Sequence, residues 1–154
     1  MLETLPISSI LAGSIVAFSL VILGYFAWKT LITSDLFQKG INLAQAQDYQ
    51  GAEAAFRKVI SLNSTNDVVR LFLGDVLNRQ GRVEEAKELF CEVISRSPKN
   101  PDAYLRLANI LMQQDKREEA KNNLQQAKEL LQKQRQPEKA TRIAQLLEKM
   151  KAKP

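Results

Sequence analysis

The chain has 154 residues, of which 45% are hydrophobic and 25% charged, a composition that belongs to an ordinary folded protein. It contains no histidine, which excludes Ser/His/Asp and Cys/His catalysis and removes the commonest metal ligand. We therefore expect no enzyme, no metal site and no cofactor. The net charge of +5 is unevenly placed, because residues 135–154 hold six basic and only two acidic side chains.

The first part of the chain is apolar. From Thr4 to Trp28 there is no charged side chain over 25 residues, which exceeds the roughly 20 residues that a helix needs to cross a bilayer. A cleaved signal peptide is the alternative, but no basic residue precedes the run and "YFAWKT" is a poor cleavage site. We expect residues 1–32 to be a retained anchor that crosses the membrane with residues 4–28.

Basic residues near the two ends of the apolar run indicate its orientation. Lys29 and Lys39 follow the run and none precedes it, so the C-terminal part should face the cytoplasm, or the stroma in a plastid. Ser9, Gly13 and Ala17 place small residues at four-residue intervals, a pattern that lets membrane helices pack together. Self-association through this face is a further hypothesis.

Between residues 35 and 132 the apolar residues have helical spacing, and turn-like clusters such as "NSTND" and "SPKNPD" interrupt them. This spacing predicts six short helices. Several positions also recur at a fixed interval of 34 residues, namely Gly40, Gly74 and Ala108; Leu43, Leu77 and Leu111; Ala52, Ala86 and Ala120; and Phe56, Phe90 and Leu124.

This pattern resembles the tetratricopeptide repeat (TPR) family, whose 34-residue unit is a helix-turn-helix with small residues at two helix contacts and an aromatic residue between units. The resemblance covers three units, 33–66, 67–100 and 101–134. It departs from the family where a frequent Trp is replaced by Leu36, Arg70 and Tyr104. We expect an all-α fold, with an N-terminal transmembrane helix, an α-solenoid of three such units and a C-terminal capping helix. Ser34 is the expected N-cap of the first unit, a few residues after the span.

Residues 135–154 are expected to form the capping helix and a basic tail. Pro137 suits a helix start, and Ala140, Ile143, Ala144 and Leu147 give residues 137–151 one apolar face that would cover the last repeat. The tail is a candidate contact for anionic lipid. We expect no nucleic acid partner, because no aromatic residue lies among these charges. The lone Cys91 reads as a small side chain on a packed helix.

In the family, the first helices of successive units line a concave groove that holds a segment of a partner protein. The resemblance implies that three sets of side chains line this groove here: Phe37, Ile41 and Ala44; then Val68, Leu71, Phe72, Asp75 and Asn78; then Asp102, Leu105, Arg106, Asn109 and Met112. About half of these residues should face the groove. The other half should belong to the core.

One subfamily binds the C-terminal carboxylate of a chaperone through Lys, Asn and Arg side chains. The matching positions here are Phe37, Ile41, Phe72, Asp102 and Arg106, of which only the last fits. A desolvated carboxylate needs several convergent donors, so we expect no such clamp. The groove should instead accept an apolar or amphipathic segment of a membrane-associated protein.

The sequence thus favours a membrane-tethered scaffold without catalytic activity. Its layout is similar to that of small membrane-anchored TPR proteins of cyanobacteria and plastids that assist photosystem I assembly, which would place it at the thylakoid. The alternative is a permanent accessory subunit of a secretion, respiratory or envelope complex.

Overall fold

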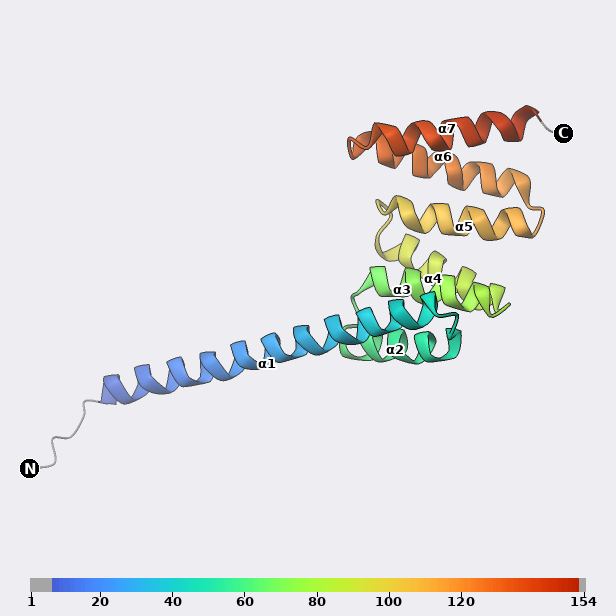
Figure 1. Cartoon of the computed structure of the whole chain (residues 1–154). Coiled ribbons are helices and arrows are strands. Elements are labelled where there is room, and N and C mark those ends of the chain that lie inside the picture. Colours follow the sequence, from blue (N-terminus) through green and yellow to red (C-terminus); the bar gives the residue numbers. More distant parts are fainter. Residues whose placement is uncertain (1–6, 153–154) are drawn as a thin grey trace, which may run out of the picture.

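The computed structural model describes residues 7–152, and this part of the chain consists of helices and turns without strands (Figure 1). Its helices are α1 (Ile7–Gln45), α2 (Tyr49–Leu62), α3 (Asp67–Arg79), α4 (Val83–Arg96), α5 (Pro101–Gln113), α6 (Arg117–Lys133) and α7 (Pro137–Ala152). The start of the predicted anchor (residues 1–6), the end of the basic tail (153–154) and the side chain of Ser9 lie outside the described residues.

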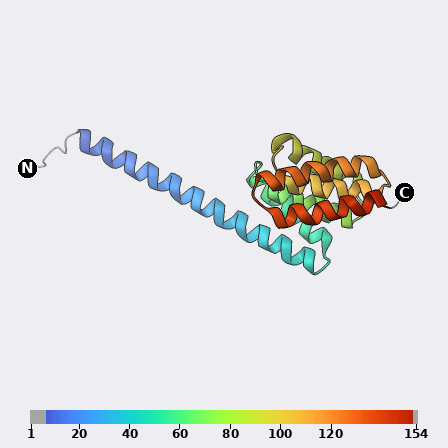
Figure 2. The same ribbon diagram turned by 90° about the horizontal axis from the view of Figure 1, so that it is seen from above.

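Helix α1 projects far from the body formed by the other helices, as two views at right angles show (Figures 1 and 2). Its side chains from Leu11 to Trp28 are exposed, and its most apolar window has a mean hydropathy of 2.0. Within the described residues it is the one helix that is long and apolar enough to cross a membrane. Gly13 and Ala17 lie on this exposed part.

The predicted helix start at Ser34 is wrong, because α1 continues without a break from the apolar run into the first repeat. Neither Gly nor Pro lies between Trp28 and Ser34. The hydroxyl groups of Thr30 and Thr33 donate to carbonyl oxygens one turn earlier, at 2.9 and 3.0 Å, so both polar side chains are satisfied within the helix. The apolar run and the first unit therefore share one helix.

The C-terminal part of α1 pairs with α2, α3 pairs with α4, and α5 pairs with α6. The three pairs stack on one another, and α7 packs against α6 at the end (Figure 1). Ala140, Ile143 and Leu147 of α7 are buried, while most of its other described side chains are exposed. The predicted cap is confirmed, and it begins at Pro137 as expected.

The 34-residue series has a direct steric basis. A Cβ atom added to Gly40 would lie 2.5 Å from Cε1 of Phe56, and one added to Gly74 would collide with the ring of Phe90. The third unit has the larger Ala108 in the first position, and the smaller Leu124 in the second. All three large partners are buried. The three pairs therefore fill a similar space, either with a glycine and a phenylalanine or with an alanine and a leucine.

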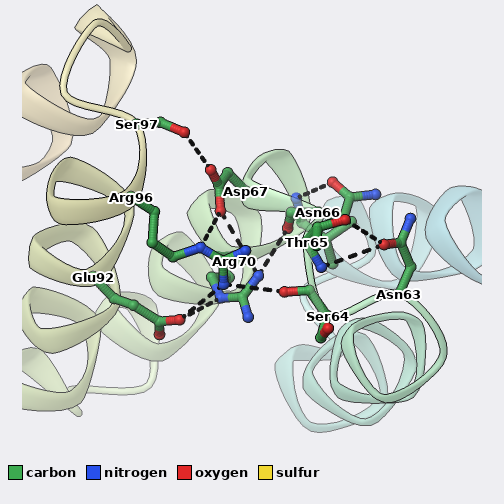
Figure 3. Close-up of polar contacts among 10 residues, drawn as sticks. Asn63, Ser64, Thr65, Asn66, Asp67, Arg70, Glu92, Arg96 and Ser97 are labelled. Atoms are coloured by element: carbon green, nitrogen blue, oxygen red, sulfur yellow. Dashed lines mark hydrogen bonds and ion pairs between the residues drawn. The ribbon is translucent and has the colours of Figure 1, made fainter.

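Hydrogen bonds join the turns between successive units into one strip. Arg96 Nη1 donates to the carbonyl oxygen of Ser64 at 3.0 Å, and Ser97 Oγ donates to Asp67 Oδ2 at 2.6 Å (Figure 3). Farther along, Gln134 Nε2 donates to the carbonyl oxygen of Lys99 at 2.8 Å. We call the three inter-unit turns, 63–66, 97–100 and 134–136, and the helix ends beside them the anchor-side rim.

Arg70 is the centre of the polar contacts on this rim. It occupies a position where the other units have Leu36 and Tyr104, and only 6% of its surface is exposed. Its Nε lies 2.9 Å from Glu92 Oε1, and its Nη1 lies 3.8 Å from Asp67 Oδ1 (Figure 3). A buried guanidinium is thus balanced by two carboxylates, one on its own helix and one on the neighbouring α4.

Candidate peptide-binding groove

A hollow of about 290 Å³ opens between the end of α1 and α3, on the face formed by the first helices of the units. Ile41, Ala44 and Phe72 give it apolar walls, and Asp75 and Arg79 give it charge. The remaining lining residues are Gln45, Gln47, Tyr49 and Val76. A hollow that combines apolar walls with a few placed polar groups is a common form of binding site.

Phe72, on the apolar side of this hollow, packs against two further aromatic rings. Phe72 meets Phe37 edge to face with ring centroids 5.3 Å apart, and lies 6.1 Å from the buried Phe56. The three rings come from α1, α2 and α3, so they fix these helices relative to one another. Phe37 and Phe72 remain half-buried and keep part of their surface available.

Charged side chains from α3 and α5 cross the centre of the groove. Arg106 Nε lies 2.9 Å from Asp75 Oδ2, and the same guanidinium lies over the ring of Phe72 at 5.8 Å. Arg79 lies over the ring of Tyr49 at 6.0 Å. Both cations therefore combine an aromatic face with the nearby carboxylate of Asp75, which places two donors and one acceptor beside the hollow.

Burial raises the pKa of Asp75 above its usual value of 3.8, although the neighbouring Arg106 acts in the opposite direction. The folded environment thus disfavours the carboxylate, despite the ion pair. Nearby, the side-chain oxygen of Asn78 is buried without a hydrogen-bond partner. A carboxyl group with a shifted pKa that lines a cleft, as Asp75 does, is a feature of functional sites.

Replacing Asp75 by asparagine is therefore expected to leave the free energy of unfolding unchanged at neutral pH, or to raise it by up to about 0.5 kcal/mol. The folded state holds the Asp75 proton more tightly than the unfolded chain does, so wild-type stability falls as the pH rises from about 3.8 through the raised pKa. The advantage of the variant should grow over this window and then stay constant. Urea unfolding followed by circular dichroism at several pH values measures the difference in the free energy of unfolding between the variant and the wild type. A clear loss of stability in the variant at neutral pH would contradict the raised pKa of Asp75.

The structure brings Ile41, Phe72 and Asp75 together at the hollow, with Ala44 beside them. Two other predicted groove residues, Val68 and Met112, are 54% and 39% exposed on α3 and α5. The rest divide by exposure: Asp102 and Asn109 are exposed, whereas Phe37, Asn78, Leu105 and Arg106 are half-buried.

One predicted groove residue belongs to the core. Leu71 is only 3% exposed and packs with the buried cluster, so it is not available to a partner. It lies one position before Phe72, on a helix face that turns inward. Conversely, Tyr49 and Arg79 line the hollow but are not among the predicted groove residues. Arg79 continues the helical spacing of residues 68, 72 and 75, which was a usable signal; Tyr49 starts a second helix and had none.

A larger and more open hollow of about 610 Å³ adjoins the first at Gln47 and Tyr49 and lies between the turn that joins α1 to α2 and the turn that joins α3 to α4. Its polar side chains already satisfy one another. Arg82 pairs with Glu53 at 2.7 Å and with Glu85 at 2.6 Å, and Gln80 donates to the carbonyl oxygen of Tyr49 at 3.0 Å. These contacts link the first two units, so we assign this hollow a structural role.

Comparisons with known proteins agree with this architecture. The family model for the tetratricopeptide repeat matches residues 43–94 and 77–150. Crystal structures of the type III secretion translocator chaperone SycD from Yersinia enterocolitica are similar. One covers 79% of this chain and 92% of its own, at 26% identity and a TM-score of 0.71. Another, in complex with a peptide of the translocator YopD, covers 78% and 92%, at 26% identity and a TM-score of 0.69.

PcrH from Pseudomonas aeruginosa shares the fold, at 21% identity and a TM-score of 0.71, with coverage of 77% of this chain and 91% of its own. No curated protein sequence matches the chain significantly. The family model spans more than half of the chain, and its two matches overlap in the second repeat unit. The chain belongs to the tetratricopeptide repeat family.

Proposed function

We propose that this protein is a membrane-anchored, non-catalytic scaffold that holds a segment of a partner protein in the groove of α1, α3 and α5. The observation that carries this proposal is the hollow between α1 and α3, where the apolar side chains of Ile41, Ala44 and Phe72 lie beside the partly buried carboxylate of Asp75. A side chain that lowers the stability of the folded protein, as the Asp75 carboxylate does, is expected where it contributes to binding.

The partner segment is expected to be apolar or amphipathic. Phe72 and Ile41 offer apolar surface, while Arg79, Arg106 and Asp75 offer polar contacts for its backbone or for a charged side chain. The structure of SycD with a YopD peptide supports this mode of binding by analogy, since that chaperone has the same fold.

The membrane anchor is supported by the exposed apolar part of α1, which has no partner within the described residues. Exposed leucine, isoleucine and phenylalanine side chains over this length are stable in hydrocarbon and costly in water. Extraction of membranes at alkaline pH tests the anchor directly. Release of the full-length protein into the soluble fraction would contradict it.

The groove is tested by isolating the full-length protein in mild detergent and quantifying the proteins that co-elute. A groove variant carries Ala44→Glu and Val68→Glu, which narrow the hollow and add two negative charges beside Asp75 and on the exposed surface of α3. A control carries Ala54→Glu and Cys91→Glu, which add the same charges at exposed positions of α2 and α4.

We expect the groove variant to lose a defined partner by roughly tenfold or more, as is common for a central contact, while the control retains it. Circular dichroism should show both variants to be fully helical. Equal retention by both variants would mean that the groove is not the binding surface. A fixed stoichiometry with a mature complex would favour the accessory subunit, whereas co-elution with immature complexes only would favour an assembly factor.

Assistance in photosystem I assembly remains the finer prediction within this proposal. It requires that photosystem subunits be among the proteins lost from the groove variant and retained by the control. A partner of another kind would remove this assignment and leave the scaffold function in place.

A further inference from the structure

All three inter-unit turns lie on the side of the body from which the apolar part of α1 projects (Figure 1). Helix α2 runs back along α1 toward the apolar segment, so the turn at residues 63–66 comes nearest to it. Ile32 and Thr33 of α1 are already half-buried, only about one helical turn after Trp28. If α1 crosses a membrane, the anchor-side rim lies close to the headgroups.

This rim carries an excess of free positive charge. Lys99, Lys133, Arg135 and Lys139 are exposed, and none of them makes an ion pair within residues 7–152. Its acidic side chains are fewer or already engaged. Asp67 and Glu92 pair with Arg70 and Arg96, which leaves Asp102 and Glu138 as exposed acids.

Two features of the rim favour its contact with a flat anionic surface. The hydrogen bonds of Arg96, Ser97 and Gln134 hold the three turns in one strip, so docking would order little additional chain. Helices α3, α5 and α7 also begin here, and the partial positive charges of their N-termini add to the side-chain charges.

The opposite rim has a different charge pattern. Two of the helices that begin there have two acidic residues in the first turn, Glu84 and Glu85 in α4 and Glu118 and Glu119 in α6, whereas α2 has none. The helices that begin on the anchor-side rim, α3, α5 and α7, have one each. Lys149 and Lys151 also lie toward that end, because α7 runs away from the anchor side (Figure 1). The described part of the basic tail therefore points away from the membrane that α1 would enter.

We propose that the anchor-side rim docks on the anionic lipid headgroups of the membrane in which α1 is embedded. This inference rests on the anchoring part of the proposed function, and it is independent of what the groove binds. Docking fixes the tilt of the repeats, so that the groove is presented to partners alongside the bilayer. The attraction should weaken with salt, because screening shortens its range from about 10 Å at 0.1 M to about 3 Å at 1 M.

The test uses the full-length protein in nanodiscs with a quencher attached to the lipid headgroups. Cys91→Ser removes the sole cysteine, and Gln132→Cys places a fluorescent label at an exposed position beside Lys133. Discs of phosphatidylcholine are compared with discs in which part of the lipid is phosphatidylglycerol. We expect quenching to be roughly threefold stronger in the anionic discs and to lose this difference at high salt.

A rim variant in the same labelled background carries Lys99→Gln, Lys133→Gln and Arg135→Gln. Glutamine is suitable at residue 135, whose φ is 57°, because Gln47 has a φ of 62° in the same chain. The control carries Lys116→Gln, Lys149→Gln and Lys151→Gln, which remove the same charge from the opposite rim. The rim variant should lose the effect of anionic lipid, and the control should keep it.

Equal quenching of the labelled parent protein, which carries only Cys91→Ser and Gln132→Cys, in the two kinds of disc would overturn the inference, whatever the variants do. Equal loss in the rim variant and in the control would also overturn it, since net charge alone would then explain the effect. Failure of the protein to co-purify with any disc would instead contradict the anchor itself. The co-elution experiment with the groove variant tests partner binding and does not affect the result of this experiment.

Discussion

Replacing Gly74 by alanine is expected to lower the free energy of unfolding of the repeats by about 2–3 kcal/mol. The added methyl group would collide with the ring of Phe90, which is only 1% exposed, so a shift of the ring would disturb the buried side chains around it. The contact lies between α3 and α4, so the loss should affect the middle unit on which both neighbours stack. Urea unfolding of the full-length protein, followed by circular dichroism, measures the change.

The third unit provides the matched rescue. Because it combines Ala108 with Leu124, the double variant Gly74→Ala, Phe90→Leu should recover a large part of the stability that the single variant loses. Phe90→Leu alone should be destabilising, since it leaves a cavity beside Gly74. Additive losses in the double variant would show that the two positions do not share one space.

Replacing Arg70 by alanine is expected to cost about 2–3 kcal/mol, less than a fully buried pair because Glu92 is partly exposed. The change removes the cation next to Asp67, whose Oδ1 atom is inaccessible and has no hydrogen-bond partner. Arg96 remains 3.4 Å from the same oxygen and limits the loss. Thermal and urea unfolding of the full-length protein measure the effect.

Arg57→Ala is the control for this prediction. Arg57 also pairs with a carboxylate, Glu53, at 2.8 Å, but about half of its side chain is exposed. Its removal should cost no more than about 0.5 kcal/mol. A second variant that combines Arg70→Ala with Asp67→Asn should be more stable than the sum of the single changes, because no uncompensated charge is left. Similar losses for Arg57 and Arg70 would contradict the assigned role of burial.

The repeat architecture was predictable because steric constraints recur with the 34-residue period. Gly74 is small for the same reason as Gly40, so the same steric requirement recurs in each unit. In the structure each glycine faces the phenylalanine of its own unit, a pairing that the spacing alone did not specify. The cap was predictable because an apolar face beginning at Pro137 had to cover the last unit. Local signals and the tertiary contacts agree at these positions.

The remaining features depend on information that one segment does not contain. Ser34 has the properties of an N-cap, yet the helix had already formed upstream, so its capping ability is unused. The choice between Leu71 and Phe72 as the exposed side chain depends on the angle at which α3 packs on its neighbours. Tyr49 reaches the hollow only because α2 folds back along α1. The placement of the groove residues as a binding surface stays a prediction.

The absence of a break in α1 has a consequence for the direction in which the groove faces. A continuous helix transmits rotation, so each residue inserted between Trp28 and Leu36 would turn the repeats by about 100° about the helix axis and lift them by about 1.5 Å. One added alanine would therefore turn the groove toward a different side of the α1 axis. Seven added residues make nearly two full turns, so the groove would return almost to its original orientation but lie about 10 Å farther along the helix axis. In a membrane-anchored protein, the number of residues between Trp28 and Leu36 would set both the orientation of the groove about the α1 axis and its distance from the bilayer.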